Sequence, residues 1–359
     1  RGTFANCPNL TGSIQNVFNQ MFYKEEDGTP NRTVIEDGQF SGFSGLTGEL
    51  VIPNYITKIG KNAFSSCSGI TSLSFEAGSN CTQIDDWAFY QTKGMKNSVV
   101  LPDSITQIGA SCFYESGITG VKLPANLQKL GAEAFYASEL SGTLTIPSSV
   151  TKIGYGAFSG LSGLKKVIIP ASVKEIGAYA FSNNKTLENV IIQGNLEKIG
   201  EYAFDGATNL KEINLPDSIT EIGMRAFRYT AVTDIKLPEN LTIISTDLFY
   251  ECKLLSNIVL GNNLTTIQSG ALQNTNISTI KFTEKIKDIS GNSFYNCKNL
   301  QEIQIGSNKN FVYESGVLMS QNRKNVIYIL DSVLVNQEKF EIPEGVEAFS
   351  VNISAYNIK

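Results

Sequence analysis

The sequence predicts a repeat solenoid, a fold in which short repeats stack along one axis. A phrase of the form S-V/I-x-K/E-I-G-x-x-A-F recurs, as in SVTKIGYGAF at 149–158, SVKEIGAYAF at 172–181 and SITEIGMRAF at 218–227. The residue that ends the phrase returns every 22 to 25 residues. One repeat of this length cannot bury enough apolar surface to offset the entropy lost on folding, so neighbouring repeats must share their faces.

The repeat position holds phenylalanine in all but one of twelve repeats, and leucine fills the remaining one. The twelve positions are Phe40, Phe64, Phe89, Phe113, Phe135, Phe158, Phe181, Phe204, Phe227, Phe249, Leu272 and Phe294. Phe4, followed by ANCPNL, resembles one more repeat at the start of the chain. We expect residues 40–305 to form a single array.

The composition argues against several classes of function. The 359 residues carry a net charge of −5, and the sequence pI is about 5.1. Nucleic-acid binding needs an excess of basic residues to neutralise phosphates, and this chain has no such excess. The chain also contains no histidine, which is the usual general base and the commonest metal ligand. We therefore expect no enzyme activity, no metal and no cofactor.

Each repeat contains a short strand. In one repeat, Val167 and Ile169 alternate with Lys166 and Ile168, which is the period of a strand with one buried face. Pro170 ends this strand because proline lacks the N–H that a β-ladder needs. We expect the corresponding strands to pair in one parallel sheet. They end at Pro53, Pro102, Pro124, Pro147, Pro170, Pro216 and Pro238.

A shorter extended segment and a turn complete the repeat. Val173 and Ile176 are the apolar positions of the extended segment. Gly177 is expected to permit a tight turn, because glycine adopts positive φ angles without strain. Ala180 and Phe181 then supply a small and a large core residue.

Residues 1–39 depart from the period and are expected to form an irregular N-terminal cap with a partial repeat. Within them, five apolar residues follow the spacing of an amphipathic helix. They are Ile14, Val17, Phe18, Met21 and Phe22. Such a helix can cover an end or a flank of the solenoid.

The repeat resembles the BspA-like class of leucine-rich repeats. The resemblance rests on LPDSITEIGMRAF at 215–227, on the turns and the I-x-L-P strand that follow, and on the recurrence of this pattern over residues 40–305. Residues 306–359 also fit. The segment YESGVLMSQNRKNVIYIL at 313–330 is similar to the hairpin of that family, and IPEGV at 342–346 begins a partial terminal repeat.

The resemblance implies a leucine-rich-repeat solenoid: a right-handed superhelix with a parallel β-sheet on one face and short strands, turns or helical turns on the other. Family members are typically surface or secreted proteins of host-associated bacteria and some mucosal protozoa, and several are adhesins. The expected function is therefore non-catalytic, extracellular binding of a host extracellular-matrix or cell-surface protein, or of another microbial surface. The alternatives are a structural spacer or display scaffold for another domain and, third, a polysaccharide-binding protein. No signal peptide precedes the first repeat, so we expect any export signal to have been removed or to lie outside this chain.

The outward strand positions form the surface on which such a solenoid binds partners. Alternation predicts two outward positions in each repeat. They are Glu49/Val51, Ser72/Ser74, Ser98/Val100, Gly120/Lys122, Thr143/Thr145, Lys166/Ile168, Asn189/Ile191, Glu212/Asn214, Asp234/Lys236, Asn257/Val259, Thr279/Lys281 and Glu302/Gln304. Four of these residues are acidic and four are basic, so the face carries no net charge.

The middle of the array holds the main candidate site. Ile168 and Ile191 occupy outward positions in adjacent repeats, where polar residues are usual. An exposed apolar pair is typical of a partner contact, although isoleucine also simply suits a strand. The candidate partner-binding residues are Lys166, Ile168, Asn189, Ile191, Glu212 and Asn214.

A second candidate surface follows the repeat aromatic by one residue. Tyrosine occupies this position in three consecutive repeats, at Tyr90, Tyr114 and Tyr136, and returns at Tyr250 and Tyr295. Stacked tyrosine rings can bind a sugar or a protein loop. They can equally pack on one another and cover the turn.

The six cysteines are expected to be buried free thiols. Cys7, Cys67, Cys252 and Cys297 lie three residues after the repeat aromatic, in a column that other repeats fill with core residues. Cys252 and Cys297 are two repeats apart, about 10 Å at strand spacing, which is too far for a disulfide. A local bridge between Cys67 and Cys81 is the main alternative, and the absence of a CxxC pair disfavours zinc.

Overall fold

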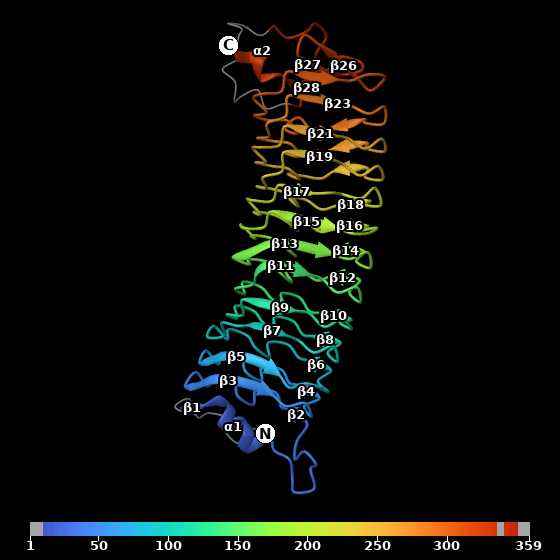
Figure 1. The fold of residues 1–359 in the computed structure, drawn as a ribbon. Helices are drawn as coiled ribbons and strands as arrows, with labels where there is room; N and C mark the ends of the chain where they lie inside the picture. The colour runs from blue at the N-terminus through green and yellow to red at the C-terminus, as the bar shows by residue number, and fades with distance from the viewer. Residues whose placement is uncertain (1–9, 336–340, 351–359) are drawn as a thin grey trace. The chain divides into compact units, whose positions relative to one another are not determined.

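Each repeat forms one coil with two short strands, and neighbouring coils pair these strands in parallel, as the computed structural model shows (Figure 1). The structure describes residues 10–335 and 341–350, so Phe4 and Cys7 lie outside the described residues. The chain forms two compact units, unit 1 (residues 1–187) and unit 2 (residues 188–359). Each unit is a β-solenoid with little helix, which confirms the predicted fold class.

In unit 1, the first strand column consists of the strands that the alternation pattern predicted. They are β1 (Gly12–Ser13), β3 (Leu46–Ile52), β5 (Ile70–Phe75), β7 (Ser98–Val100), β9 (Gly120–Lys122), β11 (Ser141–Thr145) and β13 (Gly163–Ile169). The pairs β1–β3, β3–β5, β7–β9 and β11–β13 are all parallel. Inward residues such as Leu50 and Leu73, which lie opposite each other, are buried.

Side chains bridge this column at two places where the backbone ladder stops. Between β5 and β7, Nδ2 of Asn97 donates to the Leu73 carbonyl at 3.0 Å, and Oδ1 of Asn97 accepts from the Leu73 amide at 3.3 Å. Between β9 and β11, the Ser141 amide and hydroxyl both donate to the Thr119 carbonyl, at 3.1 and 3.0 Å. The strands are parallel as expected, but the prediction that they pair in one sheet was wrong, because the described strands of this column fall into separate ladders.

The second strand column of unit 1 consists of two-residue strands. They are β2 (Val34–Ile35), β4 (Lys58–Ile59), β6 (Gln83–Ile84), β8 (Gln107–Ile108), β10 (Lys129–Leu130), β12 (Lys152–Ile153) and β14 (Glu175–Ile176). The first five pair in one continuous parallel ladder, and β12 pairs with β14. The isoleucine or leucine of each strand points into the core.

Gly177 has a different role from the predicted one. Its φ angle is not positive, and a Cβ at this position would lie 2.8 Å from the carbonyl oxygen of Ile153 in the preceding coil. The left-handed residues lie instead two positions before and after the repeat aromatic, as at Asn62 (φ 55°) and Ser66 (φ 59°) around Phe64. The predicted turn is present, since the Ala180 amide donates to the Gly177 carbonyl at 3.3 Å, but the expected reason for the glycine was wrong: glycine is needed there for the close approach of two coils.

The repeat aromatics form the centre of the core in unit 1. From Phe40 to Phe181 each ring stacks on the next, with centroids 5.0–5.7 Å apart and planes within 10° of parallel. Helix α1 (Ile14–Met21) closes the N-terminal end of this stack, because its Phe18 packs on Phe40 at 5.8 Å. The Ser13 hydroxyl caps the helix by accepting from the amide of Asn16. The predicted amphipathic helix is confirmed.

Unit 2 repeats the two strand columns. The first column contains β15 (Asn189–Ile192), β17 (Glu212–Ile213), β19 (Asp234–Lys236), β21 (Asn257–Val259), β23 (Thr279–Lys281) and β25 (Glu302–Gln304). The second contains β16 (Lys198–Ile199), β18 (Glu221–Ile222), β20 (Ile243–Ile244), β22 (Thr266–Ile267) and β24 (Asp288–Ile289). The pairs β15–β17, β19–β21, β23–β25 and β16–β18, and the ladder β20–β22–β24, are parallel.

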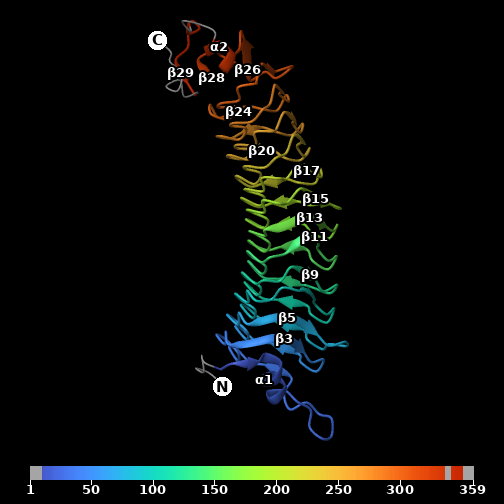
Figure 2. The same ribbon diagram turned by 60° about the vertical axis from the view of Figure 1, so that its left-hand side comes forward.

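A hairpin follows the last coil of unit 2, as predicted (Figure 2). Strands β26 (Phe311–Glu314) and β27 (Val317–Ser320) are antiparallel, and β28 (Asn325–Ile329), α2 (Asp331–Val335) and β29 (Ala348–Phe349) follow. β29 belongs to the predicted partial repeat and pairs in parallel with β28. Tyr328 packs edge-on against Phe294 at 5.5 Å, so this segment closes the end of the aromatic core.

Candidate functional site

The outward positions of the first strand column in unit 2 form a solvent-accessible face. Along β15, β19, β21, β23 and β25 the inward residues, such as Val190 and Ile235, are buried. The outward residues on the same strands are half-buried or exposed. The alternation predicted from the sequence is therefore confirmed in these strands.

A shallow hollow with a volume of about 440 Å³ opens on this face over β15, β17 and β19. Four of the predicted partner-binding residues line it: Asn189, Ile191, Glu212 and Asn214. The ladder holds Asn189 opposite Glu212, and the Asn189 side-chain amide donates to the Glu212 carboxylate. A half-buried isoleucine thus lies among amide and carboxylate groups whose positions the ladder restrains.

Part of the rest of the wall comes from residues that the sequence pattern did not single out. Lys211 precedes β17, and Thr233 precedes β19, so neither belongs to the alternating part of its strand. The Thr233 hydroxyl donates to the Asp234 carboxylate at 2.7 Å, and both residues line the hollow. The hollow therefore offers side chains of both charges, amides, a hydroxyl and two isoleucines, Ile191 and Ile213.

The other two predicted residues lie in unit 1, on β13. Lys166 is paired with Thr143 of β11, and Ile168 with Thr145. Both Lys166 and Ile168 are half-buried. The six predicted residues therefore divide between the two units, with two on β13 and four around the hollow of unit 2.

The most exposed apolar residues on the outward positions are valines. Val100 on β7 is 60% exposed and Val259 on β21 is 49% exposed, whereas Ile168 and Ile191 are only half-buried. The sequence pattern placed all four outward, but it could not rank them because exposure depends on the neighbouring coils. Val259 has the same strand position as Ile191, which makes it a useful control.

The tyrosines of the second candidate surface stack on one another in unit 1. Tyr114 lies between Tyr90 and Tyr136, with ring centroids 5.0 and 4.6 Å away. Burial, and after it the nearby Tyr136 phenol, raises the pKa of Tyr114. Tyr114 thus has a neighbouring ring on each side, which is the packing alternative, whereas Tyr90 and Tyr136 each stack on one ring of this group.

A cluster of arginine and tyrosine side chains in unit 2 was missed by the sequence pattern. Arg228 donates two hydrogen bonds to the Asp205 carboxylate, at 2.7 and 3.0 Å. Arg225 donates to the Tyr202 hydroxyl at 2.7 Å and to Asp247 at 2.9 Å. Each arginine is paired with an aspartate, so we interpret the cluster as a link between coils. Its members come from three different coils, which the pattern of a single repeat does not join.

The cysteines in the described part of the chain are buried free thiols, as predicted, and the alternative bridge between Cys67 and Cys81 is not formed. The thiol of Cys67 donates to the Phe40 carbonyl at 2.8 Å, and that of Cys252 to the Phe227 carbonyl at 3.0 Å. Burial raises the pKa of Cys67 and of Cys252 to about 12. These thiols stay protonated and tie one coil to the preceding one.

The described residues contain no group of three or more histidine, cysteine, aspartate or glutamate side chains placed to hold a metal ion. Nor does any helix in residues 10–335 or 341–350 have the length and apolarity to cross a membrane.

Comparison with protein families matches the BspA-type leucine-rich-repeat region, with six copies over residues 4–141, 140–254 and 220–341. The chain belongs to the BspA-type leucine-rich-repeat family. Its coils, of which all but that of Leu272 have an aromatic residue at the repeat position, are therefore BspA-type repeats. A search of the curated proteins found no match.

The chain is also similar to several solved structures. A leucine-rich repeat protein from Bacteroides ovatus is 25% identical, with a TM-score of 0.64 over 79% of each chain. The pneumococcal vaccine antigen PcpA is 22% identical, with a TM-score of 0.51 over 80% of this chain and 83% of its own. A leucine-rich cell surface protein from Faecalibacterium prausnitzii is 20% identical, with a TM-score of 0.41 over 79% of this chain and 92% of its own.

Proposed function

We propose that this BspA-type protein is a cell-surface or secreted, non-catalytic binding protein that recognises a protein partner through the hollow of unit 2. The expected partner is a host extracellular-matrix or cell-surface protein, or a protein on another microbial surface. The observation that carries the proposal is the hollow itself, where Ile191 lies among Asn189, Glu212 and Asn214. An apolar side chain surrounded by polar groups of both charges is the composition of a small interface core with its rim.

The geometry of the hollow favours binding by a preorganised surface. The Asn189–Glu212 hydrogen bond and the strand ladder hold the polar groups before a partner arrives, so little conformational entropy is lost on binding. Lys211 is basic and Glu212 and Asp234 are acidic, so the lining of the hollow carries only a small net charge. Affinity should therefore depend only weakly on salt, unlike binding to a polyanion.

Ile191→Asp tests the proposal. We expect it to weaken binding to immobilised matrix proteins or to bacterial cells at least tenfold, because a charge would be buried in the centre of the contact. Val259→Asp is the matched control, since it introduces the same charge at the same strand position outside the hollow. Both variants should keep the wild-type melting temperature.

Equal loss of binding in both variants, or no loss in either, would contradict the proposed site. Ile168→Asp, made separately in unit 1, tests whether Lys166 and Ile168 contribute a contact of their own. A spacer protein would bind none of these targets, with or without the substitutions.

A further inference from the structure

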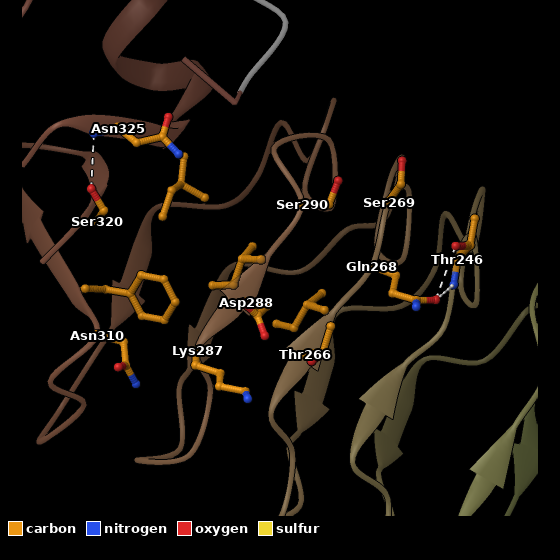
Figure 3. A pocket seen from close by; sticks show the side chains of 14 residues that line it. Thr246, Thr266, Gln268, Ser269, Lys287, Asp288, Ser290, Asn310, Ser320 and Asn325 are labelled. Carbon is orange, nitrogen blue, oxygen red and sulfur yellow. Dashed lines mark hydrogen bonds between the residues drawn. The ribbon is translucent and has the colours of Figure 1, made fainter. Parts of the chain in front are cut away.

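The second strand column of unit 2 ends at an open cavity. β24 is the last strand of the ladder β20–β22–β24, and β26 begins the separate order β26–β27–β28–β29. A cavity with a volume of about 540 Å³ is lined by residues of both strands. Figure 3 shows side chains from several coils and from the hairpin around it, among them Gln268, Asp288, Asn310 and Asn325.

The backbone of β24 is paired on one side. The Asp288 amide donates to the Thr265 carbonyl at 3.2 Å, and the Ser290 amide donates to the Ile267 carbonyl at 3.0 Å, both toward β22. In a parallel strand, successive residues direct their backbone groups to opposite neighbours. The amide and carbonyl of Ile289 therefore point away from β22, to an edge at which no strand pairs with β24 within residues 10–335 and 341–350.

The ladder stops at β24 because residues 310 and 311 of the next coil form hydrogen bonds and strand pairs elsewhere. The Asn310 amide donates to its neighbour Asn308 at 2.8 Å, and the Asn310 side chain donates to the Ile286 carbonyl at 2.9 Å. Phe311 pairs with Ser320 in the antiparallel hairpin. These contacts turn the chain away from β24 and leave its edge beside the cavity.

The cavity wall fits an extended, uncharged segment. Phe311 and Ile327 are buried and give the cavity an apolar part that can accept one aliphatic side chain. Asn325 also lines the cavity, and its Oδ1 is buried and accepts no hydrogen bond from any described residue. Lys287 and Asp288 carry opposite charges, which leaves the wall without a net preference for a charged ligand.

We infer that β24 accepts an extended peptide segment of a partner protein, which adds as a fourth strand to the β20–β22–β24 ladder through the backbone of Ile289. One aliphatic side chain of the segment contacts Phe311 and Ile327, and uncharged polar residues flank it. This site is separate from the hollow at Ile191. It recognises main-chain groups, whereas the hollow recognises a folded surface.

Ile289→Pro tests the inference, and Ile289→Val is its matched control. Proline removes the N–H that faces the cavity but none of the donors that bond to β22, and valine keeps that N–H. The probe is a phage-displayed library of random heptapeptides, selected on the wild-type chain and counter-selected on Ile289→Pro. An enriched peptide is then synthesised with an unmodified and with an N-methylated backbone.

We expect Ile289→Val to bind the unmodified peptide as the wild type does, and Ile289→Pro to bind it about fivefold or more weakly, since one backbone hydrogen bond is lost. The N-methylated peptide should bind as weakly. Hydrogen exchange of the wild type should show that the peptide protects the Ile289 amide, and this measurement holds even if the proline variant fails to fold.

Failure to enrich any heptapeptide, or equal binding of the N-methylated peptide, would overturn the inference. So would an Ile289 amide already protected in the free chain, because the chain itself would then occupy the edge. Ile191→Asp should leave peptide binding unchanged, so this inference and the proposed function can fail independently.

Discussion

Replacing Phe113 with alanine tests whether the stacked aromatic column stabilises unit 1. The ring is fully buried and stacks on Phe89 and on Phe135, each with centroids 5.2 Å away. Truncation of a buried phenylalanine to alanine costs about 3–5 kcal/mol. Because a ring pair is lost on both sides, at about 0.5–1.5 kcal/mol each, we expect the upper part of that range.

Tyr114→Ala is the matched control, one residue further along the chain. Tyr114 also stacks on a ring on each side, Tyr90 and Tyr136, but it is only half-buried. Its loss should cost about 1–3 kcal/mol, since the ring pairs are removed without a large buried cavity. The difference between the two variants measures burial rather than stacking.

The single tryptophan, Trp87, reports on this region directly. Its amide donates to the Ala110 carbonyl of the coil that carries Phe113, at 2.9 Å, so its fluorescence follows the unfolding of these coils. In urea titrations Phe113→Ala should lower the unfolding free energy by the amount above, and in thermal melts it should lower Tm by roughly 8–20 °C. Equal losses in the two variants, or a loss below about 1 kcal/mol for Phe113→Ala, would refute the assignment of the core column.

Two further predictions concern the thiols and the bridging asparagine. Above about pH 9 the unfolding free energy should fall as pH rises. Burial keeps the pKa of Cys252 at about 12 in the folded chain, whereas a thiol in the unfolded chain ionises near pH 8.5. The unfolded state therefore binds fewer protons than the folded state in this range and is favoured as pH rises. The unfolding free energy should fall with pH by at most about 1.4 kcal/mol per pH unit for each thiol. Cys252→Thr, which places a hydroxyl at this position, should reduce this pH dependence in urea titrations from about pH 7 to 11. An unchanged pH dependence would argue against the buried thiol as its cause. Asn97→Ala removes both side-chain hydrogen bonds to Leu73 and leaves the Leu73 amide and carbonyl without these partners. We expect it to lower the free energy of unfolding by about 1–3 kcal/mol, measured in thermal or urea unfolding. An unchanged free energy would show that β5 and β7 do not need the bridge.

The sequence by itself determined the coil, because the features that define it are local. Alternation over three to five residues decides which strand side chains are buried, as at Val167 and Ile169, and the return of phenylalanine places a ring in eleven of the twelve repeats. The amphipathic spacing of Ile14 and Phe18 predicted α1 for the same reason. The burial of Cys67, Cys252 and Cys297 also followed from their position in the repeat, since a residue three positions after the aromatic enters the core.

Only the tertiary structure decided the contacts between neighbouring coils, because these contacts join residues more than twenty positions apart in the sequence. The pattern could not show that Gly177 is required by the Ile153 carbonyl, or that the side chain of Asn97 replaces a backbone ladder. It placed Asn189 and Glu212 on the same face, but the hollow also depends on residues outside the alternating strand positions. The edge of β24 is open where the Asn310 amide donates to the Asn308 side chain rather than to β24. The repeat pattern of the sequence does not predict the direction of that backbone amide. Local periodicity thus specifies each coil, whereas the surfaces available to partners depend on side chains and backbone groups that meet only when the coils stack.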